Sequence, residues 1–268
     1  MQPYLGYPGG KRLIAKKIAG KLPPHETYVE PMVGGGSVYF AKSPARREVI
    51  SDIDKSLMNF YRSLKSGAIE RCDLTPKTRK FDRIRSKSKN GKSLDPCEYL
   101  YLSKLSYGGK MGSSKNPRPW RKCKGKNASR CGVASKDHDK YADRLSKTKI
   151  EHGDFKKIIR KYDSKDTVFY IDPPYTVKTK DHYRYGDLKP EEVKQAVDKV
   201  KGKALISYNN SPDIKKIFCG KDSKYVCEKI NTKYTINKFE GIKPATELLI
   251  RNYICKVTKD GKICKKVN

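Results

Sequence analysis

Short apolar runs alternate along the chain with stretches in which apolar residues recur three or four positions apart. Runs with the length and composition of strands occupy residues 27–30, 48–51, 149–155, 167–171, 203–208, 225–227 and 247–250. Helical spacing predicts helices over residues 12–21, 55–65, 95–105 and 190–201. Near the C-terminus, Asp260-Gly261 predicts a hairpin turn. This order of strands and helices indicates an α/β fold.

The run Thr167–Ile171 leads directly into Asp172-Pro173-Pro174-Tyr175. The two prolines end the strand because neither can donate to a sheet ladder. The Asp172 carboxylate and the Pro173 carbonyl are both acceptors, so together they can take the two hydrogens of a planar amino group. The ring of Tyr175 can stack on the heterocycle that carries this group. The tetrad therefore predicts a site for an exocyclic amino group such as adenine N6, at a strand end where α/β sheets bind ligands.

A strand, a glycine-rich loop and a helix follow one another near the N-terminus, which is a nucleotide-type binding unit. The loop, Gly34-Gly35-Gly36, matches neither the dinucleotide fingerprint nor the P-loop, so it does not specifically indicate a pyrophosphate or triphosphate. Glu30, just before the loop, suits a cationic group such as a ligand ammonium. Asp52 ends the next strand and is placed to accept from ribose hydroxyls. Asp154 ends a later strand, and Phe155 can stack on a purine.

Strand patterns stop between residues 66 and 147, where runs of basic residues take their place. Only Asp95 to Leu105 has the pattern of a packed helix there. We interpret residues 66–147 as an inserted module that faces nucleic acid, and a disordered basic loop is the alternative. The loop from Tyr175 to Gly186 is either a lid over a bound nucleotide or an ordinary surface loop.

The chain has 268 residues, which is enough for one large domain or a core with an inserted module. Its 61 Lys and Arg against 29 Asp and Glu give a net charge of +32. Binding to a phosphate backbone requires such a surplus and should weaken as salt rises. A general compositional bias toward lysine is the alternative. No apolar run approaches the ~20 residues of a membrane helix, so we expect no membrane partner.

The eight cysteines form no Cys-x-x-Cys pair. Cys123, Cys131 and His138 match no standard zinc spacing, and we expect no metal site. We therefore expect reduced thiols in a cytoplasmic or otherwise intracellular, reducing compartment. The N-terminus lacks a charged start followed by an apolar stretch, so we expect no secretory signal.

Several motifs in a fixed order carry a family resemblance. They are Tyr7-Pro8-Gly9-Gly10-Lys11, Glu30-Pro31 with Gly34-Gly35-Gly36-Ser37-Val38, Asp52, Asp154-Phe155, Asp172-Pro173-Pro174-Tyr175 and Glu247-Leu248-Leu249-Ile250-Arg251-Asn252-Tyr253. This set resembles the Dam-like (D12 class) DNA adenine-N6 methyltransferases, which use S-adenosylmethionine. The resemblance implies a Rossmann-like mixed seven-stranded sheet flanked by helices. Residues 1–65 and 148–268 would form the catalytic domain, and residues 66–147 the target-recognition module.

The resemblance also implies roles for individual residues. Those implied to line the cofactor pocket are Tyr7, Gly10, Lys11, Glu30, Pro31, Gly34, Gly36, Asp52, Asp154 and Phe155. The residues implied to hold the target adenine are Asp172, Pro173, Pro174 and Tyr175. The basic and aromatic residues expected to contact DNA are Tyr107, Lys110, Lys115, Arg118, Trp120, Arg121, Lys178 and Arg184. The family uses no catalytic metal.

We therefore expect an enzyme, a site-specific DNA methyltransferase, that methylates adenine N6 in a short duplex sequence after base flipping. Members that read GATC carry an arginine in a Tyr-Asn-Gly-x-x-Arg pattern, whereas residues 107–112 here are Tyr-Gly-Gly-Lys-Met-Gly, so GATC specificity is not carried over. Methylation of RNA or of a side-chain amide stays open, although the charge disfavours a protein acceptor. A non-catalytic basic DNA-binding protein with this fold is a further alternative. A companion restriction endonuclease is left open as a second partner.

Overall fold

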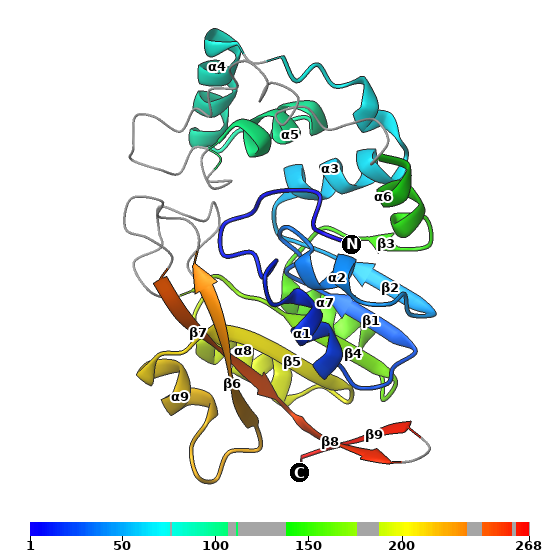
Figure 1. Cartoon of the computed structure of the whole chain (residues 1–268), viewed down its shortest axis with the longest axis vertical. Helices are drawn as coiled ribbons and strands as arrows, with labels where there is room; N and C mark the ends of the chain where they lie inside the picture. The colour runs from blue at the N-terminus through cyan, green and yellow to red at the C-terminus, as the bar shows by residue number, and fades with distance from the viewer. Residues whose placement is uncertain are drawn as a thin grey trace.

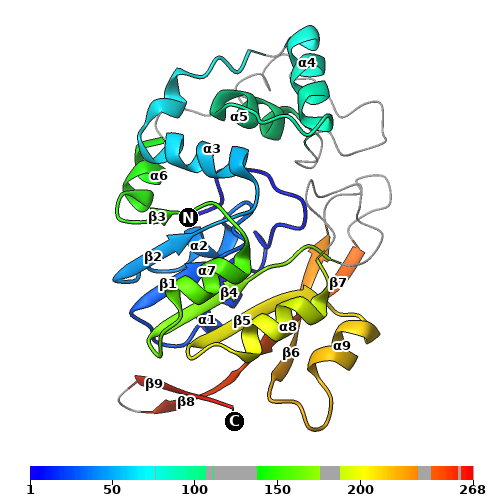
Figure 2. The same ribbon diagram turned by 180° about the vertical axis from the view of Figure 1, so that it is seen from behind.

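The computed structural model describes residues 1–75, 77–106, 111, 138–175, 188–234, 243–258 and 261–267 (Figures 1 and 2). Within them, a seven-stranded sheet has the order β3-β2-β1-β4-β5-β7-β6, and β8 pairs with β9 in a separate two-stranded sheet. The strands are β1 Thr27–Glu30, β2 Arg47–Ile50, β3 Lys149–Ile150, β4 Thr167–Ile171, β5 Lys203–Asn209, β6 Val226–Tyr234, β7 Lys243–Arg251, β8 Tyr253–Thr258 and β9 Gly261–Lys266.

The large sheet is mixed. Strands β1 to β5 pair in parallel, whereas β7 runs antiparallel to both of its neighbours, β5 and β6. The predicted α/β, Rossmann-like seven-stranded sheet is therefore confirmed. Because parallel strands present their carboxyl ends at one edge, the segments that follow β1, β2 and β4 meet there.

Helices cover both faces of the sheet. The described helices of the chain are α1 Ala15–Lys21, α2 Ser37–Ala41, α3 Lys55–Lys65, the 3-10 helix η1 Ala68–Arg71, α4 Thr78–Lys89, α5 Pro96–Leu105, α6 His138–Leu145, α7 Phe155–Tyr162, α8 Pro190–Asp198 and α9 Pro212–Phe218. Alternate residues of a strand point to opposite faces, and in β4 Val168 and Tyr170 join the core formed with α1, α2 and α3. Their neighbours Phe169 and Ile171 join the core formed with α7, α8 and α9.

The segment between α3 and β3 contains more helix than the sequence pattern predicts. Helix α5 packs against α3 and α4 (Figure 1). The expectation of a single packed helix in this segment is wrong, because α4 is also helical and buries Phe81 and Ile84. With only these two apolar residues among basic and polar ones, α4 shows little periodicity in the sequence.

The described cysteines form disulfides, which overturns the expectation of reduced thiols. The pairs are Cys72–Cys97, Cys219–Cys227 and Cys255–Cys264, and no described cysteine is free. The fold brings the partners together, since Cys255 and Cys264 lie opposite each other in the β8–β9 register. These cysteines therefore do not support a reducing compartment. Cys123 and Cys131 lie outside the described residues.

The C-terminal hairpin is confirmed by the antiparallel pairing of β8 with β9, although Asp260 itself lies outside the described residues. The hairpin lies at the opposite end of the molecule from α4 and α5 (Figures 1 and 2). Among the described helices, none has both the length and the apolar character needed to cross a membrane.

Candidate active site

A pocket of about 330 Å³ lies at the carboxyl edge of the large sheet. It is bounded by the N-terminal turn, the glycine loop after β1, the segments after β2 and β3, and the end of β4. The residues expected to hold the cofactor all line it, and they are Tyr7, Gly10, Lys11, Glu30, Pro31, Gly34, Gly36, Asp52, Asp154 and Phe155. Asp172 and Pro174 line the same pocket. The fold thus brings together residues that are up to 185 positions apart, from Tyr7 to Glu192.

The glycine loop wraps closely around Tyr7. Gly34 has a φ of +46°, and a Cβ there would lie 2.9 Å from a ring carbon of Tyr7. A Cβ on Gly35 would lie 2.8 Å from the Tyr7 Cβ. The hydroxyl of Tyr61 in α3 donates to the Gly34 carbonyl at 2.9 Å. Glycine is therefore required for both the backbone conformation and the close packing of the N-terminal turn.

Glu30 ends β1 and is only 2% exposed. The hydroxyl of Tyr28 donates to its carboxylate at 2.7 Å. Burial is the main cause that raises the pKa of Glu30 to about 8, and Asp172 also raises it. A carboxyl group with few charged partners in a pocket wall is suited to receive a cation.

Asp52 follows β2 and organises two turns of backbone. Its carboxylate accepts from the N–H of Gly34 at 3.0 Å and from the N–H of Asp54 at 3.1 Å. Burial raises the pKa of Asp52 to about 6, although these hydrogen bonds oppose the shift. Asp54 in turn caps α3 by accepting from the backbone of Ser56 at 2.9 Å. Asp52 therefore couples the glycine loop to the start of α3.

Asp154 plays a different structural part from the one predicted. The strand β3 ends at Ile150, so Asp154 does not end a strand as expected. It caps α7 and accepts from the N–H of Lys156 at 2.7 Å. As an N-cap residue, Asp154 has an extended backbone, as a strand residue would, but it belongs to the start of α7. Phe155, the first residue of α7, is buried and lines the pocket.

Asp172 is held by two side chains from other elements. Its Oδ1 accepts from Lys11 Nζ at 2.7 Å and from Ser207 Oγ in β5 at 2.9 Å. Lys11 is 4% exposed and also donates to the Gly9 carbonyl at 3.0 Å. The hydroxyl of Tyr170 lies 2.8 Å from Ser207 Oγ. The carboxylate is therefore oriented by a cation and by a chain of two hydroxyls.

Tyr175 belongs to a neighbouring environment. Its hydroxyl donates to Glu247 Oε2 in β7 at 2.5 Å, and its ring packs against the core formed with α7, α8 and α9. Lys11 Nζ lies 4.8 Å from the centre of the Tyr175 ring. Tyr175 and Pro173 are outside the set of residues that line the pocket. The tetrad thus divides between the pocket and its rim.

The structure shows contacts to the tetrad that the sequence patterns did not predict. Ser207 donates to Asp172, Tyr170 contacts Ser207, and Glu247 accepts from the Tyr175 hydroxyl. The strand register explains the role of Ser207: Ile171 lies opposite Ile206 in the β4–β5 pair, so the residues that follow them are Asp172 and Ser207. Leu188, Lys156 and Glu192 extend the pocket wall beyond the predicted set, with an ion pair between the last two.

The expected DNA contacts cannot be placed in this fold. They are Tyr107, Lys110, Lys115, Arg118, Trp120, Arg121, Lys178 and Arg184, and all of them lie outside the described residues. His138, considered with Cys123 and Cys131 as a zinc ligand, contacts the Tyr4 hydroxyl through Nδ1 at 3.0 Å.

A pocket lined by this ordered set of motifs, with the Asp-Pro-Pro-Tyr turn at its edge, can be compared with known families. The model of the family MethyltransfD12, D12 class N6 adenine-specific DNA methyltransferase, matches residues 7–236. The chain belongs to this family. The resemblance drawn from the motifs is therefore confirmed, and the protein is an enzyme that methylates adenine N6 in DNA.

Three named proteins are similar to this D12 class enzyme in sequence. The Type II methyltransferase M.MjaIII of Methanocaldococcus jannaschii is 27% identical over 305 residues, which cover 94% of this chain and 99% of that protein. The Type II methyltransferase M1.LlaDCHI of Lactococcus lactis subsp. cremoris is 25% identical over 193 residues, or 65% of this chain and 66% of that protein. The DNA adenine methylase of Escherichia coli (strain K12) is 30% identical over 116 residues, or 40% of this chain and 41% of that protein.

Proposed function

We propose that this D12 class enzyme uses S-adenosylmethionine to methylate one adenine within a short sequence of duplex DNA, after flipping that base into the site. The observation that carries the proposal is the meeting of Glu30, Asp52 and Asp172 in one pocket. Two of these acids suit the polar groups of the cofactor, and the third suits the amino group of adenine.

The acidic groups and the aromatic ring that line the pocket fit S-adenosylmethionine. Glu30 offers a buried carboxyl group for the ammonium of the cofactor, and Asp52 offers acceptors for the ribose hydroxyls. Phe155 offers a ring face for the adenine of the cofactor. Gly34 packs so closely on Tyr7 that a side chain at this position would not fit, and the backbone of the loop therefore stays open to a ligand. When bound, S-adenosylmethionine supplies an electrophilic methyl group.

Asp172 is the proposed catalytic residue. The lone pair of adenine N6 is delocalised into the ring, so the free amino group is a poor nucleophile. Acceptance of its N–H bonds by the Asp172 carboxylate and the Pro173 carbonyl would localise electron density on N6. Lys11 and Ser207 hold the carboxylate in place before the base arrives, and such preorganised electrostatics is a major source of catalysis. Stacking on Tyr175 would offset part of the few kcal/mol that base flipping costs.

The remaining assignments are part of the same proposal. Residues 66–147 would form the target-recognition module, and residues 1–65 and 148–268 the catalytic domain. The net charge of +32 favours a nucleic acid partner. A companion restriction endonuclease is included because two relatives bear the name Type II methyltransferase.

The direct test is methyl transfer from labelled S-adenosylmethionine to unmethylated plasmid DNA of mixed sequence, with the modified bases mapped by sequencing. Adenine N6 methylation within one short context is the expected result. Label in RNA but not in DNA would contradict DNA as the methyl acceptor. Label in DNA without any sequence preference would contradict site specificity. Equilibrium binding of S-adenosylmethionine without DNA tests the cofactor separately.

A further inference from the structure

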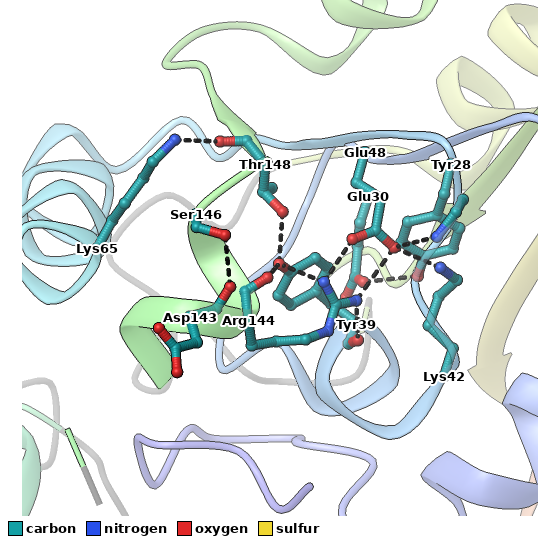
Figure 3. Close-up of polar contacts among 11 residues, drawn as sticks. Tyr28, Glu30, Tyr39, Lys42, Glu48, Lys65, Asp143, Arg144, Ser146 and Thr148 are labelled. Carbon is teal, nitrogen blue, oxygen red and sulfur yellow. Dashed lines mark hydrogen bonds and ion pairs between the residues drawn. The ribbon is translucent and has the colours of Figure 1, made fainter. Parts of the chain in front are cut away.

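A buried cluster of charged side chains lies close to Glu30, Tyr28 and Tyr39 (Figure 3). Its members are Lys42, which follows α2, Glu48 in β2 and Arg144 in α6, and their side chains are only 4%, 5% and 9% exposed. None of these residues lines the pocket. Burial of three charged groups requires that their charges and hydrogen bonds be matched.

Glu48 is the centre of this cluster. Its Oε1 accepts from Lys42 Nζ at 2.5 Å and from Arg144 Nη2 at 3.1 Å, and its Oε2 accepts from Arg144 Nη1. Burial works against ionisation of Glu48, but the hydrogen bonds from Arg144 and Lys42 outweigh it and lower its pKa. One carboxylate thus faces two cations, and the cluster carries one positive charge that Glu48 does not balance.

The cluster reaches Glu30 through two short routes. In the first, the Arg144 guanidinium lies 3.9 Å from the centre of the Tyr39 ring and donates to the Tyr39 carbonyl at 3.0 Å. A backbone hydrogen bond from Tyr39 is in turn one of the influences that lower the pKa of Glu30. In the second, Lys42 Nζ lies 4.4 Å from the centre of the Tyr28 ring, and the Tyr28 hydroxyl donates to Glu30 at 2.7 Å.

Glu30 is a nearby acid that can balance the surplus positive charge. His25 also faces Lys42 and Glu48, and burial lowers its pKa. The other titratable groups that face Glu30 are Asp172 with its partner Lys11, and the tyrosines 28, 39, 61 and 170. Asp172 and Lys11 form their own ion pair at 2.7 Å. The tyrosines are neutral, because burial raises the pKa of each. Two acids, Glu30 and Glu48, therefore match two cations, Lys42 and Arg144, only when Glu30 is ionised.

We propose that Lys42 and Arg144 are positioning residues that supply the buried positive charge needed for Glu30 to bind the cationic methyl donor as a carboxylate. This inference rests on the proposed role of Glu30 in binding S-adenosylmethionine. Arg144 lies in the helix that leads from the inserted segment back to β3, so the docking of α6 contributes to the cofactor site.

Substitutions in the cluster can remove either a positive charge, at Lys42 or Arg144, or the negative charge of Glu48. Affinity for S-adenosylmethionine is measured by titration calorimetry between pH 6 and pH 9, without DNA, on the full chain. For the wild type, affinity should rise with pH and level off once Glu30 is ionised. R144M removes a cation and should move the midpoint of this rise upward by about one pH unit, which weakens binding about tenfold below the midpoint. E48Q removes an anion and should move the midpoint downward, although it breaks the same ion pair.

Two further variants separate charge from structure. The double variant K42M/E48Q keeps the net charge of the wild-type cluster and should have the wild-type midpoint. Y39F removes a hydroxyl that contacts Arg144 and Thr148 without changing charge, and its midpoint should also be unchanged. If R144M does not fold, K42M is measured in its place, because it also removes a cation from the cluster. If E48Q does not fold, K42M/E48Q is compared with R144M or K42M.

The outcomes distinguish the inference from the function on which it rests. Weaker binding in R144M, with a midpoint equal to that of the wild type, would mean that the cluster supports the structure of the site but does not affect the ionisation of Glu30. This result would overturn the inference. A shift of R144M and E48Q in the same direction would overturn it as well. Absence of binding by the wild type at every pH would instead overturn the cofactor assignment. E30Q should bind weakly and without dependence on pH in this range.

Discussion

Ser207 in β5 donates a hydrogen bond from Oγ to Oδ1 of Asp172, at 2.9 Å, across the junction of two parallel strands. The same oxygen accepts from Lys11 Nζ at 2.7 Å. Ser207 is fully buried, and its Oγ lies 2.8 Å from the Tyr170 hydroxyl. The orientation of the proposed catalytic carboxylate is therefore set by residues outside the Asp-Pro-Pro-Tyr tetrad.

We expect S207A to slow methyl transfer about tenfold, because a hydrogen bond to a charged group contributes roughly 1.5 kcal/mol. Affinities for S-adenosylmethionine and DNA should stay close to those of the wild type. Single-turnover transfer of labelled methyl groups measures the chemical step. Y170F is the matched control, since it removes a hydroxyl that contacts Ser207 but not Asp172. A rate in S207A equal to that of the wild type would show that Lys11 alone orients the carboxylate.

D172A should lower the rate of methylation by at least about a hundredfold, the effect typical of losing one preorganised group. DNA binding should remain nearly intact, because Asp172 lines the pocket and is not among the basic and aromatic residues expected to contact DNA. Methyl transfer and DNA binding are measured on the same preparation. Turnover close to that of the wild type would contradict the proposed mechanism.

Much of the fold follows from local sequence patterns. The runs that form β1 and β4 are found at their predicted residues, since each is short, apolar and closed by an acid or by prolines. The ends of such strands carry Glu30 and Asp172, so the pocket residues could be selected before the topology was known. Helix α3 is also found at its predicted bounds, Lys55–Lys65.

Features that depend on distant partners did not follow from local patterns. Helix α4 is stabilised by contacts of Phe81 and Ile84 with the rest of the core, and its own sequence is mostly charged. Cys72 pairs with Cys97 only because the fold brings the end of η1 to the start of α5. The cluster around Glu48 joins residues 96 positions apart in the sequence, and no spacing rule connects them.

G34A should weaken binding of S-adenosylmethionine and destabilise the protein by about 1–3 kcal/mol. Its φ of +46° is unfavourable for alanine, and the new Cβ would lie 2.9 Å from the Tyr7 ring. Thermal unfolding and cofactor binding measure the two effects. The control is G20A in α1, where a Cβ meets nothing within 4 Å. It should leave binding unchanged and stability equal or slightly higher. Equal effects of the two changes would contradict the close-packed loop.

The stability of the cofactor-free protein should fall as pH rises from about 5 to 8, in part because of Glu30. Its pKa is raised from 4.5 to about 8 in the folded state. Between these values the unfolded chain loses a proton that the folded protein keeps, so unfolding becomes more favourable. E30Q should show a smaller fall, measured by thermal unfolding across this range. Asp52, whose pKa is raised to about 6, also lowers the stability as pH rises toward that value. Because Asp52 is present in both the wild type and E30Q, its effect cancels when the two proteins are compared. Parallel pH profiles for the two proteins would contradict burial of a protonated Glu30.

Removal of the Cys72–Cys97 disulfide should destabilise the protein more than removal of Cys255–Cys264. The first pair spans 25 residues of sequence and the second spans 9. Because a longer closed loop restricts the unfolded chain more, the loss should be about 3 kcal/mol for C72S/C97S and about 1 kcal/mol less for C255S/C264S. Urea unfolding of both double variants under oxidising conditions measures these free energies. Addition of a thiol reductant should lower the stability of the wild type and leave smaller effects in each variant. An unchanged wild-type curve in reductant would show that these cysteines do not form disulfides in solution.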